Sequence, residues 1–222
     1  MAGPEWIAGV DEAGRGSVVG PLVVGAFCIP ADRAGALSAA GARDSKLLSA
    51  SRREAVYATL RTLGEMRSVS LAPATIDRWV RQGRLNDLEA RAFARVLGDR
   101  SFSTVYVDAC DPVPRRFAAM VARHLRTAGR IVALHHADRD IPVVGAASIV
   151  AKVRRDRAIA RIRDRFGATL GSGYPSDGRT VAWLGLLAGP DDPARSAVRA
   201  SWATLRRLNA GPAARTLEEF AR

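Results

Sequence analysis

The sequence has little cysteine, histidine and lysine, with only two, three and two of these residues among 222. Cys28 and Cys110 are too few for a disulfide framework, and no finger-like spacing joins them to a histidine, which argues against structural zinc. Because both cysteines lie in apolar runs, we expect small buried side chains there. No apolar run reaches the roughly 18 residues of a membrane span. The first residues also lack the pattern of a secretory signal, so we expect a cytoplasmic protein.

Acidic residues are in deficit, since 34 lysines and arginines face 22 aspartates and glutamates and give a net charge of +12. Such a charge suggests a polyanionic partner, most simply nucleic acid. Codon bias toward arginine is the alternative, because 32 of the 34 cations are arginines. The two lysines, Lys46 and Lys152, are candidates for positions that need a compact ammonium, with chance retention as the alternative.

What is present is the composition of one folded domain, with 48% hydrophobic and 25% charged residues. Short β-branched runs predict strands near 6–10, 22–29, 66–71, 104–107 and 131–134. Helical spacing, with Ser51 and Ser176 as expected caps, predicts helices over 51–63, 86–97, 114–125, 142–166, 176–187 and 196–208. This alternation indicates an α/β fold. We expect a catalytic-type domain over 1–170, a small helical extension over 171–208 and a flexible tail over 209–222.

Four carboxylates, on Asp11, Glu12, Asp108 and Asp138, each follow an apolar run that predicts a strand. Strand ends of an open α/β sheet bring side chains from distant sequence together. Four carboxylates in one place repel one another, and divalent cations with oxygen ligands relieve this repulsion. Two such ions about 3.5–4 Å apart can activate a water and stabilise the leaving oxygen in phosphodiester cleavage. An acidic pocket in a basic protein therefore fits a metal-dependent nuclease.

Other roles for these aspartates stay open on spacing alone. An aspartate after a strand is commonly a turn former or a helix cap, and Asp138 in particular could cap the helix that follows it. Asp111 and Asp140 are neighbours that spacing does not distinguish from the four. The sequence alone therefore predicts an acidic site without fixing its members.

Two loops are further candidates for ligand contacts. The glycines around Arg15, Gly14 and Gly16, could let backbone N–H groups approach a ligand closely, although an ordinary turn has the same composition. The pattern is neither a dinucleotide fingerprint nor a Walker loop. Tyr174 lies between a glycine and a proline and could stack on a sugar or base, or simply pack against the protein.

Together these residues resemble the motifs of the ribonuclease HII family, the type 2 ribonucleases H, in their archaeal form. The matching stretches run in order along the chain, at 9–16, 20–23, 44–47, 107–109, 136–138, 143–156, 171–177 and 198–202. Both lysines fall inside them, so chance retention becomes the weaker explanation, although Lys152 receives no defined role. Two positions depart from the pattern. His136 replaces the usual Lys, which predicts an altered pH or metal response, and Gly178 replaces the usual Pro, which predicts a looser tyrosine loop.

The resemblance implies an RNase H-like fold, a mixed central sheet flanked by helices, with a small C-terminal helical extension. It implies cleavage of RNA in RNA–DNA hybrids and on the 5′ side of single ribonucleotides in duplex DNA, with two Mg²⁺ or Mn²⁺ ions and with 3′-hydroxyl and 5′-phosphate products. The family's metal-binding carboxylates match Asp11, Glu12, Asp108 and Asp138. The family's loop that senses the 2′-hydroxyl matches Gly14, Arg15 and Gly16. Its lysine near the phosphate that is cut matches Lys46, and its tyrosine that packs on the sugar matches Tyr174.

Two other functions remain as alternatives. Another RNase H-like nuclease, such as a junction resolvase, would cut branched all-DNA substrates, and an inactive hybrid-binding protein would cut nothing. The tail over 216–221 resembles a sliding-clamp-binding motif, because Leu217 and Phe220 stand three apart as in a short helical anchor. Ala214 stands where that motif has Gln, and a disordered amphipathic end is the alternative. We expect the protein to be a monomer.

Overall fold

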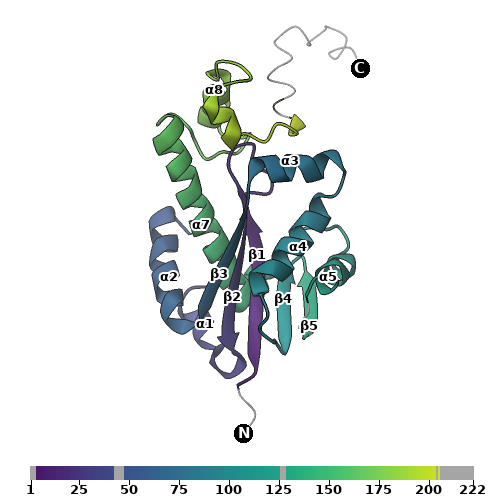
Figure 1. Cartoon of the computed structure of the whole chain (residues 1–222). Coiled ribbons are helices and arrows are strands. Elements are labelled where there is room, and N and C mark those ends of the chain that lie inside the picture. Colours follow the sequence, from purple (N-terminus) through teal and green to yellow (C-terminus); the bar gives the residue numbers. More distant parts are fainter. Residues whose placement is uncertain (1–3, 43–47, 126–128, 204, 206–222) are drawn as a thin grey trace, which may run out of the picture.

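The computed structural model describes residues 4–42, 48–125, 129–203 and 205. A mixed five-stranded sheet forms the centre, in the order β3-β2-β1-β4-β5 (Figure 1). The middle strand, β1 (Trp6–Ala13), pairs antiparallel with β2 (Leu22–Pro30) and parallel with β4 (Thr104–Asp108). The edges are β3 (Glu65–Leu71) and β5 (Arg130–Leu134). All five strands lie where the sequence predicts them, although β1 runs three residues further.

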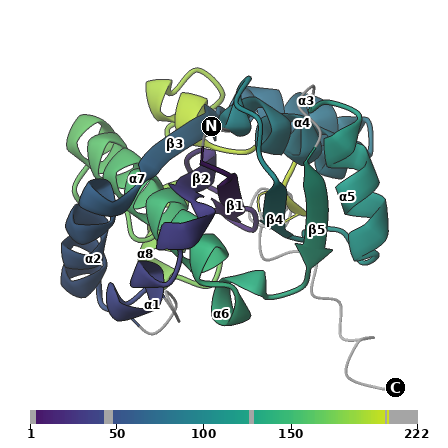
Figure 2. The ribbon, with the colours of Figure 1, turned by 90° about the horizontal axis from the view of Figure 1, so that it is seen from below.

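Helices cover both faces of the sheet (Figure 2). One face carries α4 (Leu85–Leu97) and α5 (Pro114–Ala122), and the other carries α2 (Ala50–Leu63) and the long α7 (Pro142–Phe166). Among the described helices, none is long and apolar enough to span a bilayer. The shorter helical elements are η1 (Ala31–Arg33), α1 (Ala36–Ala39), α3 (Pro73–Arg81), α6 (Ala137–Asp140), α8 (Gly178–Gly185) and η2 (Pro193–Ala197).

Side chains of β2 alternate between two cores because successive residues of a strand point to opposite faces. Ala26 and Cys28 pack into the core under α4 and α5, whereas Phe27 and Ile29 pack into the core under α2 and α7. Each fully buried aliphatic or aromatic side chain of this kind stabilises the fold by about 1.5–3 kcal/mol. With both faces covered, the central strands hold Asp11, Glu12 and Asp108 on a well-packed support. The expected burial of Cys28 is confirmed.

Two glycines let α7 lie close against the sheet. A Cβ at Gly9 would lie 2.1 Å from the carbonyl oxygen of Val143, and one at Gly25 would lie 2.6 Å from that of Ala147. Any side chain at either position would push the helix away from β1 and β2. The close contact brings polar residues of the next turns of α7 against the end of β1.

Both expected helix caps are wrong by one or two residues. α2 begins after Ser49, whose hydroxyl accepts from the Arg52 N–H at 3.2 Å, and not at Ser51. α8 begins after Asp177, which replaces Ser176 as the cap. In each case two oxygen-bearing side chains lie close together in sequence. Either can accept from the first free N–H groups, so the pattern alone does not choose between them.

The C-terminal extension differs from the expected helix over residues 196–202, whereas residues 203 and 205 are helical and residues 204 and 206–208 lie outside the described residues. Residues 193–197 form a 3₁₀ helix, and Val198 then forms an isolated bridge with Val19. Trp183 and Leu184 of α8 join Val198 in a separate small core against α7. The division at residue 170 stays a prediction, and the tail over 209–222 lies outside the described residues. The helix α3 was not predicted, although a proline at its first position indicates it.

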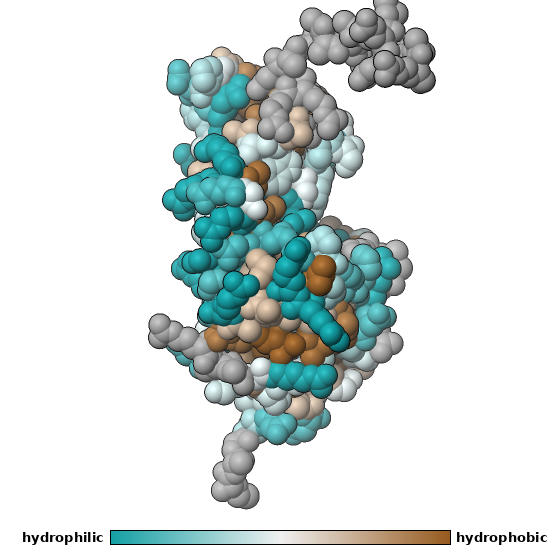
Figure 3. Space-filling model, turned by 90° about the vertical axis from the view of Figure 1, so that its right-hand side faces the viewer, coloured by the Kyte–Doolittle hydropathy of each residue, from teal (hydrophilic) through white to brown (hydrophobic). Residues whose placement is uncertain are grey.

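An apolar groove of about 280 Å³ lies between α5 and β5, lined by Ala118, Ala122, Leu125 and Ile131 among others. It belongs to the side of the molecule in Figure 3, where an apolar area interrupts a hydrophilic surface. None of the described residues that line the groove has a titratable side chain. Chemistry that needs charged groups must therefore take place elsewhere.

Candidate active site

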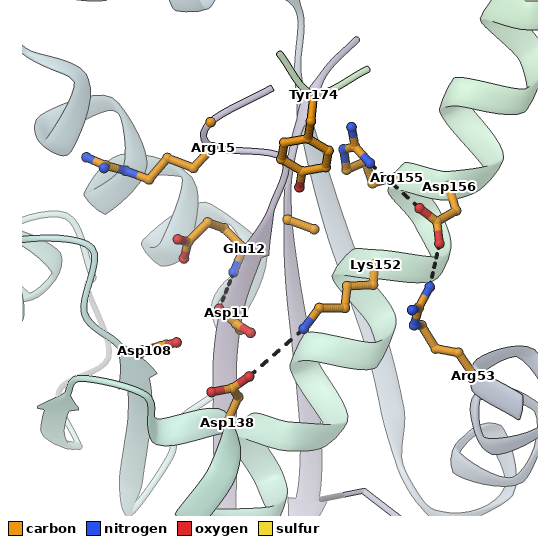
Figure 4. Close-up of a pocket in the computed structure, with 13 residues that line it drawn as sticks. Asp11, Glu12, Arg15, Arg53, Asp108, Asp138, Lys152, Arg155, Asp156 and Tyr174 are labelled. Carbon is orange, nitrogen blue, oxygen red and sulfur yellow. Dashed lines mark hydrogen bonds and ion pairs between the residues drawn. The ribbon is translucent and has the colours of Figure 1, made fainter. Parts of the chain in front are cut away.

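A cleft of about 380 Å³ opens at the carboxyl end of β1, beside α7 (Figure 4). It brings together eight of the nine residues that the sequence analysis selected, and the ninth, Lys46, lies outside the described residues. The eight are Asp11, Glu12, Gly14, Arg15, Gly16, Asp108, Asp138 and Tyr174. Four further residues complete its charged lining, namely Arg53, Lys152, Arg155 and Asp156.

The carboxylates reach the cleft from three parts of the fold. Asp11 and Glu12 lie within β1 and not after it, because the strand continues to pair with β2 as far as Ala13. Asp108 is the last residue of β4, and the parallel register of β1 and β4 places it next to Asp11. Asp138 lies in the short helix α6 and does not cap α7.

Burial and mutual repulsion make Asp11 and Glu12 poor anions without a counter-ion. Burial and the neighbouring charge of Asp108 raise the pKa of Asp11 from 3.8 to about 6. The pKa of Glu12 is raised well above its usual value by burial and then by Asp11. Glu12 Oε2 is also buried without a hydrogen-bond partner among the described residues, a state that costs free energy. A cation in the cleft would relieve both effects.

The donor set suits a hard divalent ion, because it consists of carboxylate oxygens, which favour Mg²⁺ or Mn²⁺. No three acidic, histidine or cysteine side chains of the described residues already surround one ion position. Mg²⁺ does not need such a cage, since it usually binds one or two carboxylates together with waters and substrate phosphate. The arrangement therefore fits ions that are bound together with a substrate.

Lys152 is a site residue for which the sequence analysis had no role. Its ammonium donates to the Ser148 hydroxyl at 2.5 Å and lies 4.0 Å from Asp138 Oδ2. Its charge opposes the effect of burial on the pKa of Asp11. The composition could have indicated a role for Lys152, because it is one of only two lysines in a chain whose other basic residues are mostly arginines.

The two glycines of the loop 14–16 differ in what the protein requires of them. Gly14 has φ of +87°, and a Cβ there would lie 2.6 Å from Arg155 Nε. At Gly16 φ is not positive, and no atom lies within 4 Å of where a Cβ would be. The fold therefore needs glycine at position 14, whereas position 16 leaves open space in the wall of the cleft.

The Arg15 side chain turns away from the cleft (Figure 4). Its Nε donates to Glu89 Oε1 at 2.9 Å, and its Nη2 donates to Asn86 Oδ1 at 2.8 Å. The backbone N–H groups of Arg15 and Gly16 donate to no described residue. This loop therefore offers backbone donors to the cleft and not a guanidinium.

Arg155 of α7 holds the tyrosine loop against the glycine loop. Its guanidinium carbon lies 4.4 Å from the centre of the Tyr174 ring. Its Nη2 donates to the Ser17 hydroxyl at 2.9 Å and to the Ser172 carbonyl at 2.7 Å. The sequence analysis missed this role, because one arginine among 32 gives no signal of its own.

The competing aspartates have other partners or positions. Asp111 is buried outside the cleft, where Arg116 donates to both of its oxygens at distances of 2.8–3.0 Å. Asp140 is exposed on α6 and does not line the cleft. Cys110 is only half-buried, and its thiol donates to Glu89 at 3.0 Å. None of the three joins the acidic site.

The two positions that depart from the archaeal-type motifs lie outside the lining of the cleft. His136 has φ of +57° and stands just before α6. Gly178 begins α8. Next to it, Asp177 accepts from the backbone N–H of Ser172 at 2.5 Å and so bridges the two ends of the tyrosine loop. The expected effects of both departures stay predictions.

The family model described as Ribonuclease HII matches residues 8–205. The chain belongs to the ribonuclease HII family. It is 43% identical to the ribonuclease HII of Cenarchaeum symbiosum over 92% of this chain and 98% of that one. The ribonuclease HII of Methanoregula boonei is 41% identical over 96% and 99% of the two chains.

Solved structures agree with this assignment. The crystal structure of ribonuclease H2 from Pyrococcus horikoshii matches with a TM-score of 0.82 and 37% identity, over 92% of this chain and 97% of that chain. The RNase HII in a PCNA:RNase HII complex from Archaeoglobus fulgidus matches with a TM-score of 0.81 and 34% identity, over 96% and 100%. The predicted family, the RNase H-like fold and the activity class of ribonuclease H endonuclease are thereby confirmed.

Proposed function

We propose that this ribonuclease HII cuts the RNA strand of RNA–DNA hybrids and the 5′ side of single ribonucleotides in duplex DNA, leaving 3′-hydroxyl and 5′-phosphate ends. The observation that carries the proposal is one cleft that joins acidic residues, a glycine loop and a tyrosine. Two Mg²⁺ or Mn²⁺ ions would be held by Asp11, Glu12, Asp108 and Asp138. When bound, such ions supply an activated water and stabilise the leaving oxygen.

The chain's own residues would select and orient the substrate. A ribose differs from a deoxyribose by its 2′-hydroxyl, so a specific enzyme must contact this group. The backbone N–H groups of Arg15 and Gly16 can do so for any base, because they do not read base edges. The Tyr174 ring would pack on the adjacent deoxyribose and exclude a second 2′-hydroxyl, which disfavours pure RNA. Lys152 and Lys46 would balance the charge of the phosphate that is cut.

A direct test is to incubate the protein with Mg²⁺ and a duplex that carries one ribonucleotide. We expect one cut on the 5′ side of the ribonucleotide, with a 3′-hydroxyl end, and no cut in the matched all-DNA duplex. Cleavage of a branched all-DNA junction would instead favour a resolvase. Binding of the duplex without any product would favour an inactive hybrid-binding protein, and either result would contradict the proposal.

We also propose that the tail binds a sliding clamp through Leu217 and Phe220, which lie outside the described residues. The A. fulgidus RNase HII was solved in complex with PCNA, and this supports the same kind of partner here. Removal of the last ten residues is expected to abolish retention on an immobilised sliding clamp while leaving cleavage of a short duplex unchanged. Equal retention of the full and shortened chains would contradict the proposal.

The proposed assembly and location follow from this function. We therefore propose a monomer that acts in the cytoplasm, where its DNA substrates are found.

A further inference from the structure

The loop 14–16 is held at its carbonyl side by a residue far away in the sequence. Arg199 is fully buried, and its Nη1 donates to the carbonyl oxygen of Arg15 at 2.9 Å. Its Nε donates to the carbonyl oxygen of Gly20 at 3.0 Å. One guanidinium thus joins the two ends of the segment that follows β1.

The same loop is held at its side-chain end by α4. Glu89 is fully buried and forms an ion pair with Arg15 at 2.9 Å, while Asn86 accepts from the other end of the Arg15 guanidinium. Asn86 is fixed in turn, because its amide donates to Asp111 at 2.8 Å. Arg15 is therefore held through its side chain by α4 and through its carbonyl by Arg199, two parts of the chain that are distant in sequence.

The C-terminal segment is also docked by contacts that do not involve the Arg199 side chain. Backbone hydrogen bonds already connect Arg199 N–H to Val18 and Gly20 N–H to Ala197. Asp77 adds two more anchors, since its carboxylate accepts from the backbone N–H groups of residues 200 and 201 at 2.8 and 3.0 Å. A buried guanidinium loses its hydration, and this cost is recovered only through well-made contacts. Its Nη2 has no partner among the described residues. Besides a contact of 5.0 Å between its guanidinium carbon and the centre of the Trp202 ring, the two hydrogen bonds to the loop segment are the contacts that offset this cost.

We propose that Arg199 and Glu89 are positioning residues, which fix the loop 14–16 so that its free N–H groups meet a ribose 2′-hydroxyl. The inference rests on the proposed function of this loop and extends it, because it assigns ribonucleotide selectivity to two residues outside the loop. A contact of this kind discriminates only when the donors are held in place before the substrate arrives.

Selectivity is measured as the ratio of two dissociation constants, for an all-DNA duplex and for the same duplex with one ribonucleotide. Binding is followed by fluorescence anisotropy with Ca²⁺ in place of Mg²⁺, after a check that no product forms. The variant Arg199→Lys keeps the positive charge but loses the two guanidinium donors that bind the carbonyl oxygens of Arg15 and Gly20. The variant Glu89→Gln keeps the shape of the side chain but loses the ion pair with Arg15. We expect either change to lower the ratio by about threefold to tenfold, as for the loss of one ordinary hydrogen bond. The affinity for the all-DNA duplex is expected to stay the same.

Asp77→Asn is the matched control, because it weakens the anchoring of the same C-terminal segment without touching the loop. Its ratio is expected to equal that of the wild type. An unchanged ratio in folded Arg199→Lys and Glu89→Gln overturns the inference, and so does an equal fall in Asp77→Asn. If Arg199→Lys does not fold, Glu89→Gln alone decides. A wild-type protein that binds both duplexes equally would instead refute the proposed role of the loop itself.

Discussion

Asp11→Asn is expected to lower the turnover of a duplex with one ribonucleotide by about 10³-fold or more, the scale on which enzymes lose activity when a group that stabilises the transition state is removed. Asn keeps the shape of the side chain but not its charge, so the centre of the proposed metal site is lost. Asp11 belongs to the middle strand of the sheet and lies beside Asp108 of the neighbouring strand. The measurement is single-turnover cleavage at saturating Mg²⁺. Undiminished turnover would refute the assignment of the site.

The same substitution is expected to stabilise the metal-free protein, which separates lost catalysis from lost folding. Burial and Asp108 raise the pKa of Asp11 to about 6, so the folded state keeps a proton that the unfolded state releases above pH 4. The wild type therefore loses stability as pH rises from about 4 to 6. At about 1.4 kcal/mol per pKa unit, the variant gains up to about 3 kcal/mol above pH 6. Urea unfolding in EDTA at pH 5 and 8 tests this, and a variant less stable than the wild type at pH 8 would contradict it.

Most helices and strands of the fold could be predicted from local sequence patterns. α7 was predicted at both ends, because Pro142 begins it and Gly167 follows it. The exact caps of α2 and α8 could not be predicted, since neighbouring side chains compete for the same N–H groups. The start of the C-terminal helix was wrong for a different reason, because residues 196–202 are not α-helical, whereas residues 203 and 205 are. There the backbone pairs with Val19, some 180 residues away in the sequence, instead of forming a helix. A local sequence pattern does not contain information on such a distant contact.

The lining of the cleft was predictable where a residue type stands at a strand end or in a recognisable motif. The carboxylates, the glycine loop and Tyr174 belong to this group. Arg155, Arg199 and Glu89 do not, because their roles depend on contacts with residues that are between 17 and 184 positions away. Because the chain has 32 arginines, its composition does not indicate which few of them are buried. Only the three-dimensional arrangement distinguishes them from the solvated majority.

Gly16→Ala is expected to lower kcat/KM for the single-ribonucleotide duplex by about 10²-fold, the effect of displacing a substrate by roughly 1 Å. The free energy of unfolding is expected to stay the same, because the new methyl group meets no protein atom within 4 Å. Gly35→Ala adds a methyl group in equally open space, but Gly35 does not line the cleft. It is the matched control and should leave both quantities unchanged.

Gly14→Ala is expected to behave in the opposite way, with a loss of stability of about 1–3 kcal/mol from its left-handed backbone and further loss from the clash with Arg155. The contrast between two glycines on either side of Arg15 is the decisive part of the experiment. If the loop were an ordinary turn, Gly16→Ala would be harmless and only Gly14→Ala would matter. Reduced cleavage by a Gly16→Ala protein that melts like the wild type would mean that the substrate, and not the fold, requires glycine at position 16.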